Sequence, residues 1–201
     1  LGFESVNVDL IYGLPMQTTA SFDRTLAQIK SLRPDRIALY AYAHLPDRFK
    51  PQRRIHAEDL PLGGTKVAML SRSLDALTEA GYVYIGMDHF ALPDDELSIA
   101  QRSGDLHRNF MGYTTRKQTD LIGFGVSSIS QVADSFSQNA KDLATWAQCI
   151  ESGKPSTVRG MHTSRDDRIR SEVIQQIMCH GLVCFKDIED RFELEFARYF
   201  H

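Results

Sequence analysis

The sequence VNVDLIYGL runs from Val6 to Leu14, is short, apolar and rich in Val and Ile, and is followed directly by Pro15. Such a segment predicts a buried strand that ends in a turn. Apolar residues then recur at helical spacing, with Ser21 as the expected helix cap and Pro34 as the residue that ends the pattern. The sequence therefore opens with a strand and a helix.

The following segments repeat this order. RIALYAYAH, at 36–44, is a second strand candidate, and the charged stretch 47–63 predicts a surface loop. A helix is expected from Thr65 to a stop at Gly81, and YVYIGM, at 82–87, is a third strand candidate. Strands that alternate with helices are typical of a parallel α/β sheet, either open or closed into a barrel.

The pattern changes beyond residue 90. Residues 93–120 are polar with weak periodicity, and the short apolar run LIGFGVSSIS occupies 121–130. Amphipathic segments follow at 143–150, 164–177 and 186–200, and Ser164 with Asp167 resembles a capping box at the start of the second. We therefore expect an α/β region up to about residue 150 and a helical unit after it.

Composition narrows the classes of function. The 201 residues include 23 Lys and Arg and 26 Asp and Glu, which leaves a formal charge of −3. This balance gives no electrostatic reason to expect nucleic acid or an anionic membrane as a partner. No apolar run approaches the ~20 residues of a membrane span, and no basic-then-apolar leader opens the chain. We therefore expect a cytoplasmic protein.

Two further features concern how the chain is held together and where it starts. The three cysteines, Cys149, Cys179 and Cys184, have spacings that fit neither a disulfide framework nor a zinc site. The sequence begins without Met, directly before a strand, and stops directly after an aromatic pair. We expect it to be an excerpt of a longer protein.

Asp9 is the polar residue that stands out in the first strand. With the alternation of a strand, Asn7, Asp9 and Ile11 share one face. A polar side chain near the carboxyl end of such a strand points at the place where ligands bind in parallel α/β folds. The alternative is a carboxylate that accepts hydrogen bonds from nearby turn amides, and the residues alone leave both open.

The second strand candidate offers a weaker signal. Its small or aliphatic side chains, Leu39, Ala41 and Ala43, share a face and would let a flat ligand lie close to the backbone. They would equally pack beneath a helix, and the spacing favours packing.

Met87, Asp88, His89 and Phe90 follow the third strand, so an acid and a base are adjacent there. Neighbouring residues on extended backbone point to opposite faces, so we do not expect Asp88 and His89 to form a relay by themselves. Local evidence favours capping by Asp88 and packing of His89.

The segment 107–115, HRNFMGYTT, combines a cation, an amide, aromatic rings and hydroxyls. Arg108 could bind a carboxylate with two hydrogen bonds, and its alternative is a surface ion pair. Gly123 and Gly125 would let a ligand approach the backbone, but Ser128 occupies the last position of G-x-G-x-x-G, so no dinucleotide site is expected.

The segments that carry a family resemblance are VNVDLIYGLPMQT at 6–18, YAHLP at 42–46, GYVYIGMDHFALPDDEL at 81–97, LHRNFMGYTT at 106–115 and GVSSIS at 125–130. At these segments the chain resembles oxygen-independent coproporphyrinogen III oxidases, which are radical S-adenosylmethionine (SAM) enzymes of haem synthesis. The first segment is shared among related radical enzymes, whereas IGMDHFA and HRNF-x-GYTT are specific.

The resemblance implies an architecture and a reaction. It implies part of a radical SAM, partial TIM-type β/α barrel at 1–150 and the start of a mostly helical C-terminal domain at 151–201. The implied reaction is the oxygen-independent oxidative decarboxylation of coproporphyrinogen III to protoporphyrinogen IX, in which two propionates become vinyls. In the family, a 4Fe-4S cluster held by a CxxxCxxC motif cleaves SAM to a 5′-deoxyadenosyl radical.

That cysteine motif is absent from the 201 residues. We therefore expect the cluster ligands upstream of Leu1, no metal site within the chain, and no activity of the excerpt alone. The implied partners are coproporphyrinogen III and an electron donor for the cluster, and the implied state is a monomer.

The resemblance also assigns cofactor contacts, although it assigns no catalytic side chain. Asp9 is similar to the carboxylate that accepts hydrogen bonds from the ribose of the first SAM, and Ala43 and Ile129 are similar to contacts of a second SAM. Weaker candidates that line the same space are Ile11, Phe110 and Met111.

Two alternatives to the oxidase remain. Related haem-binding chaperones carry H-N-x-x-Y-W where this chain has His107, Arg108, Asn109 and Phe110, a difference that favours the oxidase. The other alternative is a folded fragment without catalytic activity.

Overall fold

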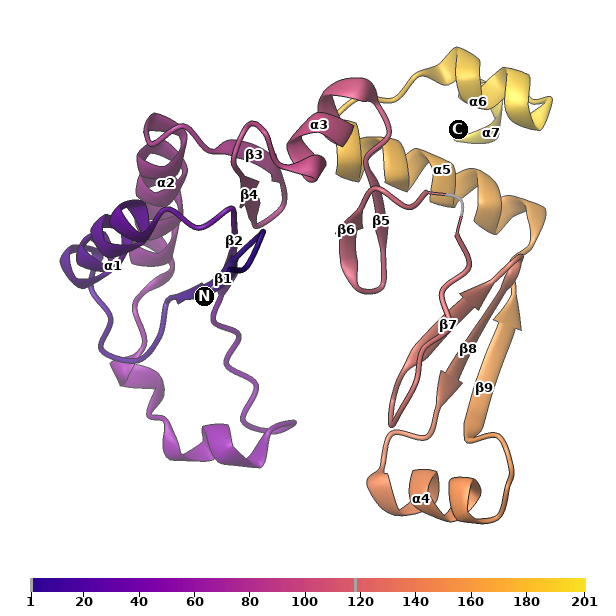
Figure 1. The fold of residues 1–201 in the computed structure, drawn as a ribbon, viewed down its shortest axis with the longest axis horizontal. Helices are drawn as coiled ribbons and strands as arrows, with labels where there is room; N and C mark the ends of the chain where they lie inside the picture. The colour runs from indigo at the N-terminus through magenta and orange to yellow at the C-terminus, as the bar shows by residue number, and fades with distance from the viewer. Residues whose placement is uncertain (1, 118) are drawn as a thin grey trace. The chain divides into compact units, whose positions relative to one another are not determined.

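The computed structural model describes residues 2–117 and 119–201. Its contacts divide the chain into two compact units, Leu1–Gly104 and Asp105–His201, which Figure 1 shows in indigo to magenta and in rose to yellow. Each unit has its own sheets and helices. No helix among the described residues is long and apolar enough to cross a membrane.

The first unit is built on a four-stranded sheet with the order β1-β2-β4-β3. Its strands are β1 (Asn7–Tyr12), β2 (Arg36–Ala41), β3 (Val83–Gly86) and β4 (His89–Ala91). β1 and β2 are parallel, whereas β4 runs antiparallel to both of its neighbours. The helices of this unit are α1 (Thr19–Leu32), α2 (Gly63–Glu79) and α3 (Glu96–Ser103), with short 3₁₀ helices η1 (Lys50–Arg54) and η2 (Ala57–Asp59) between β2 and α2.

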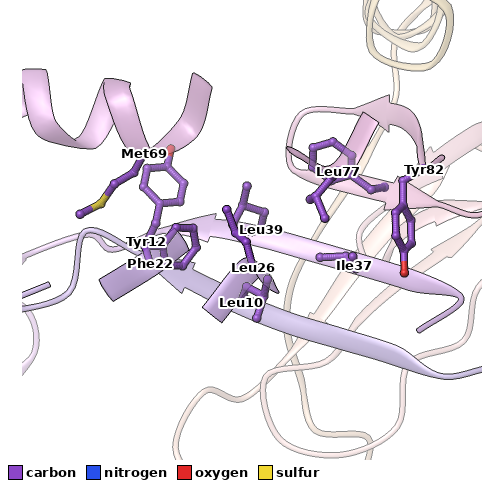
Figure 2. Packing of buried hydrophobic residues seen from close by; sticks show 10 residues of the cluster. Leu10, Tyr12, Phe22, Leu26, Ile37, Leu39, Met69, Leu77 and Tyr82 are labelled. Atoms are coloured by element: carbon purple, nitrogen blue, oxygen red, sulfur yellow. The ribbon is translucent and has the colours of Figure 1, made fainter. Parts of the chain in front are cut away.

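Helices α1 and α2 cover one face of this sheet and close the core. Figure 2 shows the buried side chains that meet there, which come from β1, β2, β4, both helices and the residue directly before β3. The cluster consists of Leu10, Tyr12, Phe22, Leu26, Ile37, Leu39, Met69, Leu77, Tyr82 and Phe90. Phe22 and Leu26 of α1 and Met69 and Leu77 of α2 are the buried apolar residues that hold these helices on the sheet.

Most of the predicted order in this unit is confirmed, with two corrections. The cap of α1 is Thr18, not Ser21: Thr18 Oγ1 accepts from the Ser21 amide at 3.1 Å, and Ser21 Oγ accepts from the Thr18 amide at 2.9 Å. The sheet is also not all parallel, because the three-residue strand β4 lies between β2 and β3. So short a strand gives too little alternation to be recognised in the sequence.

The described residues of the second unit form two antiparallel sheets and four helices. The hairpin of β5 (His107–Asn109) and β6 (Gly112–Thr114) precedes a three-stranded sheet of β7 (Ile129–Val132), β8 (Ser135–Asn139) and β9 (Thr157–His162). The helices are α4 (Leu143–Glu151), α5 (Arg165–His180), α6 (Phe185–Phe192) and α7 (Phe196–Tyr199). The capping box of Ser164 and Asp167 is confirmed at the start of α5.

The expectation of a helical region at 151–201 is only partly right. Helices α5, α6 and α7 lie there, but β9 precedes them and pairs with β8. The mixed α/β class is confirmed. The sheets in the described residues are open, because each has two edge strands and does not close into a barrel. The expected boundary at residue 150 falls within the second unit, and it stays a prediction about the parent protein.

Candidate functional site

The face of the first sheet that lies away from α1 and α2 presents polar side chains. On β1, Asn7, Asp9 and Ile11 are exposed, while Leu10 and Tyr12 on the other face are buried. Asn7 Nδ2 donates a hydrogen bond of 2.8 Å to Asp9 Oδ1. The predicted face alternation is therefore confirmed, and Asn7 orients a carboxylate that can accept further hydrogen bonds.

The turn after β1 is held by Gln17, a residue that the sequence reasoning missed. Gln17 Oε1 accepts from the amides of Gly13 at 2.6 Å and Leu14 at 3.2 Å, and Gln17 Nε2 donates to the Ile11 carbonyl at 3.3 Å. The alternative in which Asp9 satisfies the turn amides is therefore wrong. An amide side chain four residues after the turn glycine was the signal that could have revealed this.

Ala43 lies just beyond the end of β2, in a segment that Gln52 holds in place. Gln52 Nε2 donates to the Ala43 carbonyl at 3.0 Å, and Gln52 Oε1 accepts from the Leu45 amide at 2.6 Å. Ala41 and Ala43 are exposed, whereas Leu39 is buried in the core. The favoured packing role therefore applies to Leu39 and not to the two alanines.

Asp88 and His89 do interact, contrary to the expectation from extended backbone. Asp88 Oδ1 and His89 Nδ1 lie 2.7 Å apart. The reason is that Asp88 lies in the turn between β3 and β4, not in a strand, after Met87 with a φ of 52°. In a turn, adjacent side chains are not forced to opposite faces as they are in a strand.

In the second unit, Phe110 and Met111 form the turn of the β5–β6 hairpin. The Met111 amide donates to Asn109 Oδ1 at 2.8 Å, which closes the turn. The Phe110 ring meets Phe136 of β8 edge-on, with ring centroids 5.5 Å apart. The Met111 side chain, by contrast, is 83% exposed.

Ile129 begins β7 and shares a cavity with Phe110. The cavity has a volume of about 440 Å³ and is lined by Phe110, Ile129, Phe136, Ser137, Gln138, Arg159, Gly160 and Met161. Met111 is not among these lining residues. The structure thus brings two of the predicted contacts, Phe110 and Ile129, to one largely apolar cavity of the second unit.

Arg108 does not form the surface ion pair that was one of its predicted roles, among the described residues, and its other role, binding a carboxylate, stays a prediction. Its Nε is buried and has no hydrogen-bond partner among the described residues, and its guanidinium lies over the Tyr113 ring at 5.7 Å from the centroid. Gln175 accepts from the Arg108 amide at 3.0 Å and donates to its carbonyl at 2.5 Å, which fixes the backbone. A buried unpaired donor is costly and usually indicates a partner outside the described atoms.

Gly123 has a structural role. A Cβ at this position would lie 2.7 Å from the Ile129 carbonyl oxygen, closer than a side chain tolerates. The absence of a side chain at Gly123 therefore permits the pairing of Leu121 with Gln131. This structural role accounts for the glycine without a dinucleotide site.

A larger cavity of about 1060 Å³ in the second unit is charged but balanced. Its lining includes Lys117, Arg165, Arg168 and Arg191 as well as Asp134, Asp167, Glu172 and Glu193. Two of these cations are already paired, Arg168 with Asp134 at 3.2 Å and Arg191 with Glu172. Burial and, to a smaller extent, the nearby Lys117 lower the pKa of His107, which also lines the cavity. The cavity therefore shows no excess of either charge.

The six predicted contacts thus fall into two sets. Asp9, Ile11 and Ala43 belong to the first unit, and Phe110, Met111 and Ile129 belong to the second. Within residues 2–117 and 119–201, no group of three or more His, Cys, Asp and Glu side chains is placed to hold a metal ion.

Comparison with known proteins confirms the resemblance seen in the motifs. Over 200 residues the chain is 53% identical to the oxygen-independent coproporphyrinogen III oxidase of Pseudomonas aeruginosa and 48% identical to that of Escherichia coli. The match covers 100% of this chain and 44% of each relative, so the chain spans less than half of their length. No family model matches the chain.

A solved structure agrees with these relatives. The coproporphyrinogen III oxidase of Escherichia coli, described as a radical SAM enzyme, matches with a TM-score of 0.96 and 48% identity. The match covers 99% of this chain and 46% of that one. The likeness therefore extends to the fold along almost the whole chain.

Proposed function

We propose that this chain is part of an oxygen-independent coproporphyrinogen III oxidase, whose parent protein decarboxylates two propionates of coproporphyrinogen III to the vinyls of protoporphyrinogen IX. The observation that carries the proposal is the likeness over the whole chain, at 53% identity in sequence and a TM-score of 0.96 in structure. The parent would act with an electron donor for its cluster, as a monomer in the cytoplasm.

The proposed architecture follows from the same likeness. Residues 1–150 would contribute one part of a radical SAM β/α barrel, and residues 151–201 would begin the C-terminal domain. The parallel pair β1 and β2, with α1 and α2 on one face, supports the barrel because such barrels repeat strand and helix around a central sheet.

The side chains present fit SAM as a cofactor. When bound, SAM and a 4Fe-4S cluster held outside this chain supply the radical that removes hydrogen from the propionate. Asp9, exposed and oriented by Asn7, would accept hydrogen bonds from the ribose hydroxyls. Ile11, two residues along the same face of β1 and 43% exposed, is a weaker candidate that would line the cofactor space.

The remaining contacts are proposed for the second SAM molecule. Ala43 would contact it through a segment that Gln52 keeps in place, and Ile129 and Phe110 would contact it through the 440 Å³ cavity that they share. Met111 lies outside that lining, so its contact would come from the tip of the hairpin.

The test of the proposed function uses the full-length parent protein. After anaerobic reconstitution of its cluster and addition of SAM and an electron donor, we expect carbon dioxide release from coproporphyrinogen III, with the porphyrinogen products quantified by chromatography. The 201-residue chain treated in the same way serves as the control and should release none. Absence of release by a full-length protein that holds its full iron complement would refute the proposal.

The haem-chaperone alternative is not favoured, because the reported relatives carry the oxidase name. Mixing the full-length protein with haemin would still decide between them. A stoichiometric, shifted absorption band that survives gel filtration would support the chaperone, and free haemin in the included volume would support the oxidase.

A further inference from the structure

We propose that Arg159 binds a propionate carboxylate of the tetrapyrrole substrate in the cavity of about 440 Å³ in the second unit. The inference rests on the proposed function, since it names a substrate contact of that reaction. The starting observation is that, of the described residues that line this cavity, Arg159 alone carries a charge.

The cavity lies over one face of the sheet of β7, β8 and β9, which run side by side in Figure 1. Ile129, Gln138 and Arg159 are paired in one row across the three strands. Phe136 and Met161, two residues along β8 and β9, are paired with each other. Residues two apart in a strand share a face, so these side chains form a largely apolar floor with one cation on its β9 side.

Gln138 holds the guanidinium of Arg159 in place. Gln138 Oε1 accepts from Arg159 Nε at 2.8 Å and also from Arg159 Nη2. Gln138 Nε2 donates to the Ser127 carbonyl at 3.0 Å, which fixes the amide with its oxygen towards the arginine. The position of the guanidinium is therefore set by the sheet before any ligand binds.

This arrangement leaves the charge of Arg159 without a counterion. An amide oxygen accepts hydrogen bonds but carries no net charge, and no carboxylate in residues 2–117 and 119–201 pairs with Arg159. Gln138 occupies the edge of Nε and Nη2, so the outer edge of Nη1 and Nη2 is left for a ligand. That edge is a planar fork that matches the two oxygens of a carboxylate, and apolar surroundings strengthen such a pair.

The lining favours a propionate of coproporphyrinogen III over the carboxylate of SAM. SAM also has a carboxylate, but its sulfonium and ammonium groups leave it with a net positive charge, and no acidic side chain lines the cavity among the described residues. A porphyrinogen combines apolar ring edges with anionic propionates, as the apolar floor and single cation require. Ile129, proposed as a cofactor contact, lies two strands from Arg159, with about 10 Å between their backbones.

Arg159→Gln is the first test, because it removes the cation and leaves an amide that can still bond to Gln138. We expect the Kd for coproporphyrinogen III to rise about tenfold, since hydrogen bonds to charged groups are the stronger ones. The measurement is anaerobic titration calorimetry on the full-length parent protein with its cluster reconstituted. Without an electron donor, no turnover disturbs the titration.

Two further variants separate binding of the substrate from support of the sheet. Gln138→Glu keeps the arginine and gives it a carboxylate partner within the protein, so it should also raise the Kd although it strengthens the link between β8 and β9. A purely structural role of Arg159 predicts wild-type binding by this variant. Arg159→Lys keeps the charge but loses the fork, and its Kd should lie between those of wild type and Arg159→Gln.

The matched control is Arg198→Gln on the exposed side of α7, which makes the same chemical change in the same unit. It should leave the Kd for coproporphyrinogen III unchanged. Titration of the same variants with SAM identifies the source of the carboxylate. We expect the Kd values for SAM to be those of wild type in all of them.

An unchanged Kd for coproporphyrinogen III in Arg159→Gln overturns the inference. A rise in the Kd for SAM that equals or exceeds the rise for coproporphyrinogen III also overturns it, because the arginine would then serve the cofactor or the fold as a whole.

The outcomes also separate this inference from the proposed function. Wild-type protein whose binding of coproporphyrinogen III depends on Arg159, but which releases no carbon dioxide with an electron donor present, refutes the reaction and supports the substrate contact. Release of carbon dioxide together with a Kd that is independent of Arg159 supports the reaction and refutes the contact. Wild-type protein that does not bind coproporphyrinogen III overturns both.

Discussion

At the scale of single residues, Asp9 is the side chain whose proposed role is easiest to isolate. Its neighbour Asn7 donates to one carboxylate oxygen, and the exposed position leaves room for ribose hydroxyls as further donors. Asp9→Asn removes the charge and half of the acceptor capacity while it keeps the shape. We expect the SAM concentration for half-maximal activity of the full-length protein to rise about tenfold, because hydrogen bonds to charged groups are the stronger ones.

The control for this substitution is Asp75→Asn on the exposed side of α2, which makes the same chemical change away from the sheet. It should leave the SAM dependence unchanged. Superimposable SAM titrations of wild type and Asp9→Asn would show that Asp9 is not a cofactor contact.

The three cysteines differ in reactivity because they differ in burial. Burial raises the pKa of Cys179 to about 11, and its side chain is 2% exposed. At pH 8 only about one thousandth of this thiol would be ionised, and the thiolate is the form that reacts. We expect iodoacetamide to alkylate exposed Cys184 in the native chain and to leave Cys179 unmodified, as measured by peptide mass spectrometry.

Denaturation supplies the control, since all three cysteines should react in concentrated urea. Because the raised pKa favours the neutral thiol, raising the pH towards 11 should increase the reaction at Cys179 if the fold persists. Equal modification of Cys179 and Cys184 at pH 8 in the native chain would contradict the burial described for α5.

Sequence reasoning at this scale succeeded for faces and failed for turns. Alternation placed Asp9 on the open face correctly, because the period of a strand fixes the face of every residue. It missed the contact of Asp88 with His89 and the role of Gln17, because both depend on turn geometry that no periodicity encodes. Gly13 belongs to the same class: its φ is +80°, and a Cβ there would lie 3.1 Å from the Lys66 side chain.

At the scale of elements, the start of α1 shows why the helix cap was predicted three residues too late, at Ser21 instead of Thr18. Thr18 and Ser21 form a reciprocal capping box, so each side chain satisfies an amide at the helix start. Either residue is a common cap, and only the backbone of Thr18, with a φ of −115° and a ψ of 161°, identifies it as the first residue outside the helix.

Removing this cap should destabilise the first unit. Thr18→Ala leaves the Ser21 amide without its acceptor, and the expected loss in free energy of unfolding is about 1 kcal/mol. Urea denaturation followed by circular dichroism would measure it. Thr78→Ala is the matched control, because Thr78 lies near the end of α2 and its hydroxyl donates to the Leu74 carbonyl of its own helix. An equal loss in both variants would contradict the cap.

The strands of the second unit illustrate the limit of local patterns. β8 and β9 are polar and half-buried or exposed along their length, so they lack the apolar alternation that predicts a strand. Their pairing joins Ser135 to His162 across a connection that includes α4. Such pairing depends on contacts distant in sequence, and for that reason 151–201 could not be recognised as beginning with a strand.

At the scale of the whole molecule, the division of the chain after Gly104 separates what the sequence could predict from what it could not. The first unit follows the strand and helix order that periodicity revealed, apart from β4. In the second unit, the spacing of apolar residues predicted α4 and α5. The strands of its sheets lie in largely polar segments, which gave no such pattern. Phe110 and Ile129 are proposed as contacts only on the family resemblance, because neither residue belongs to a pattern with a chemical meaning of its own.

The same scale bears on how the proposed site is interpreted. The chain covers 44% of the length of the relatives that it matches. Its candidate contacts are cofactor contacts, and no group of side chains in the described residues is placed to hold a metal ion. We therefore propose that, in the parent protein, this segment positions the cofactor and another segment supplies the ligands of the cluster.

The connection between β3 and β4 also constrains how this gene segment can vary. Because Met87 and Asp88 alone join the two strands, the loss or gain of one codon there would shift β4 by one position against β2. Every side chain of β4 would then change face, which would put the His89 ring into the core and the Phe90 ring into solvent. Homologous sequences should therefore differ here by substitution and keep the length of the turn constant.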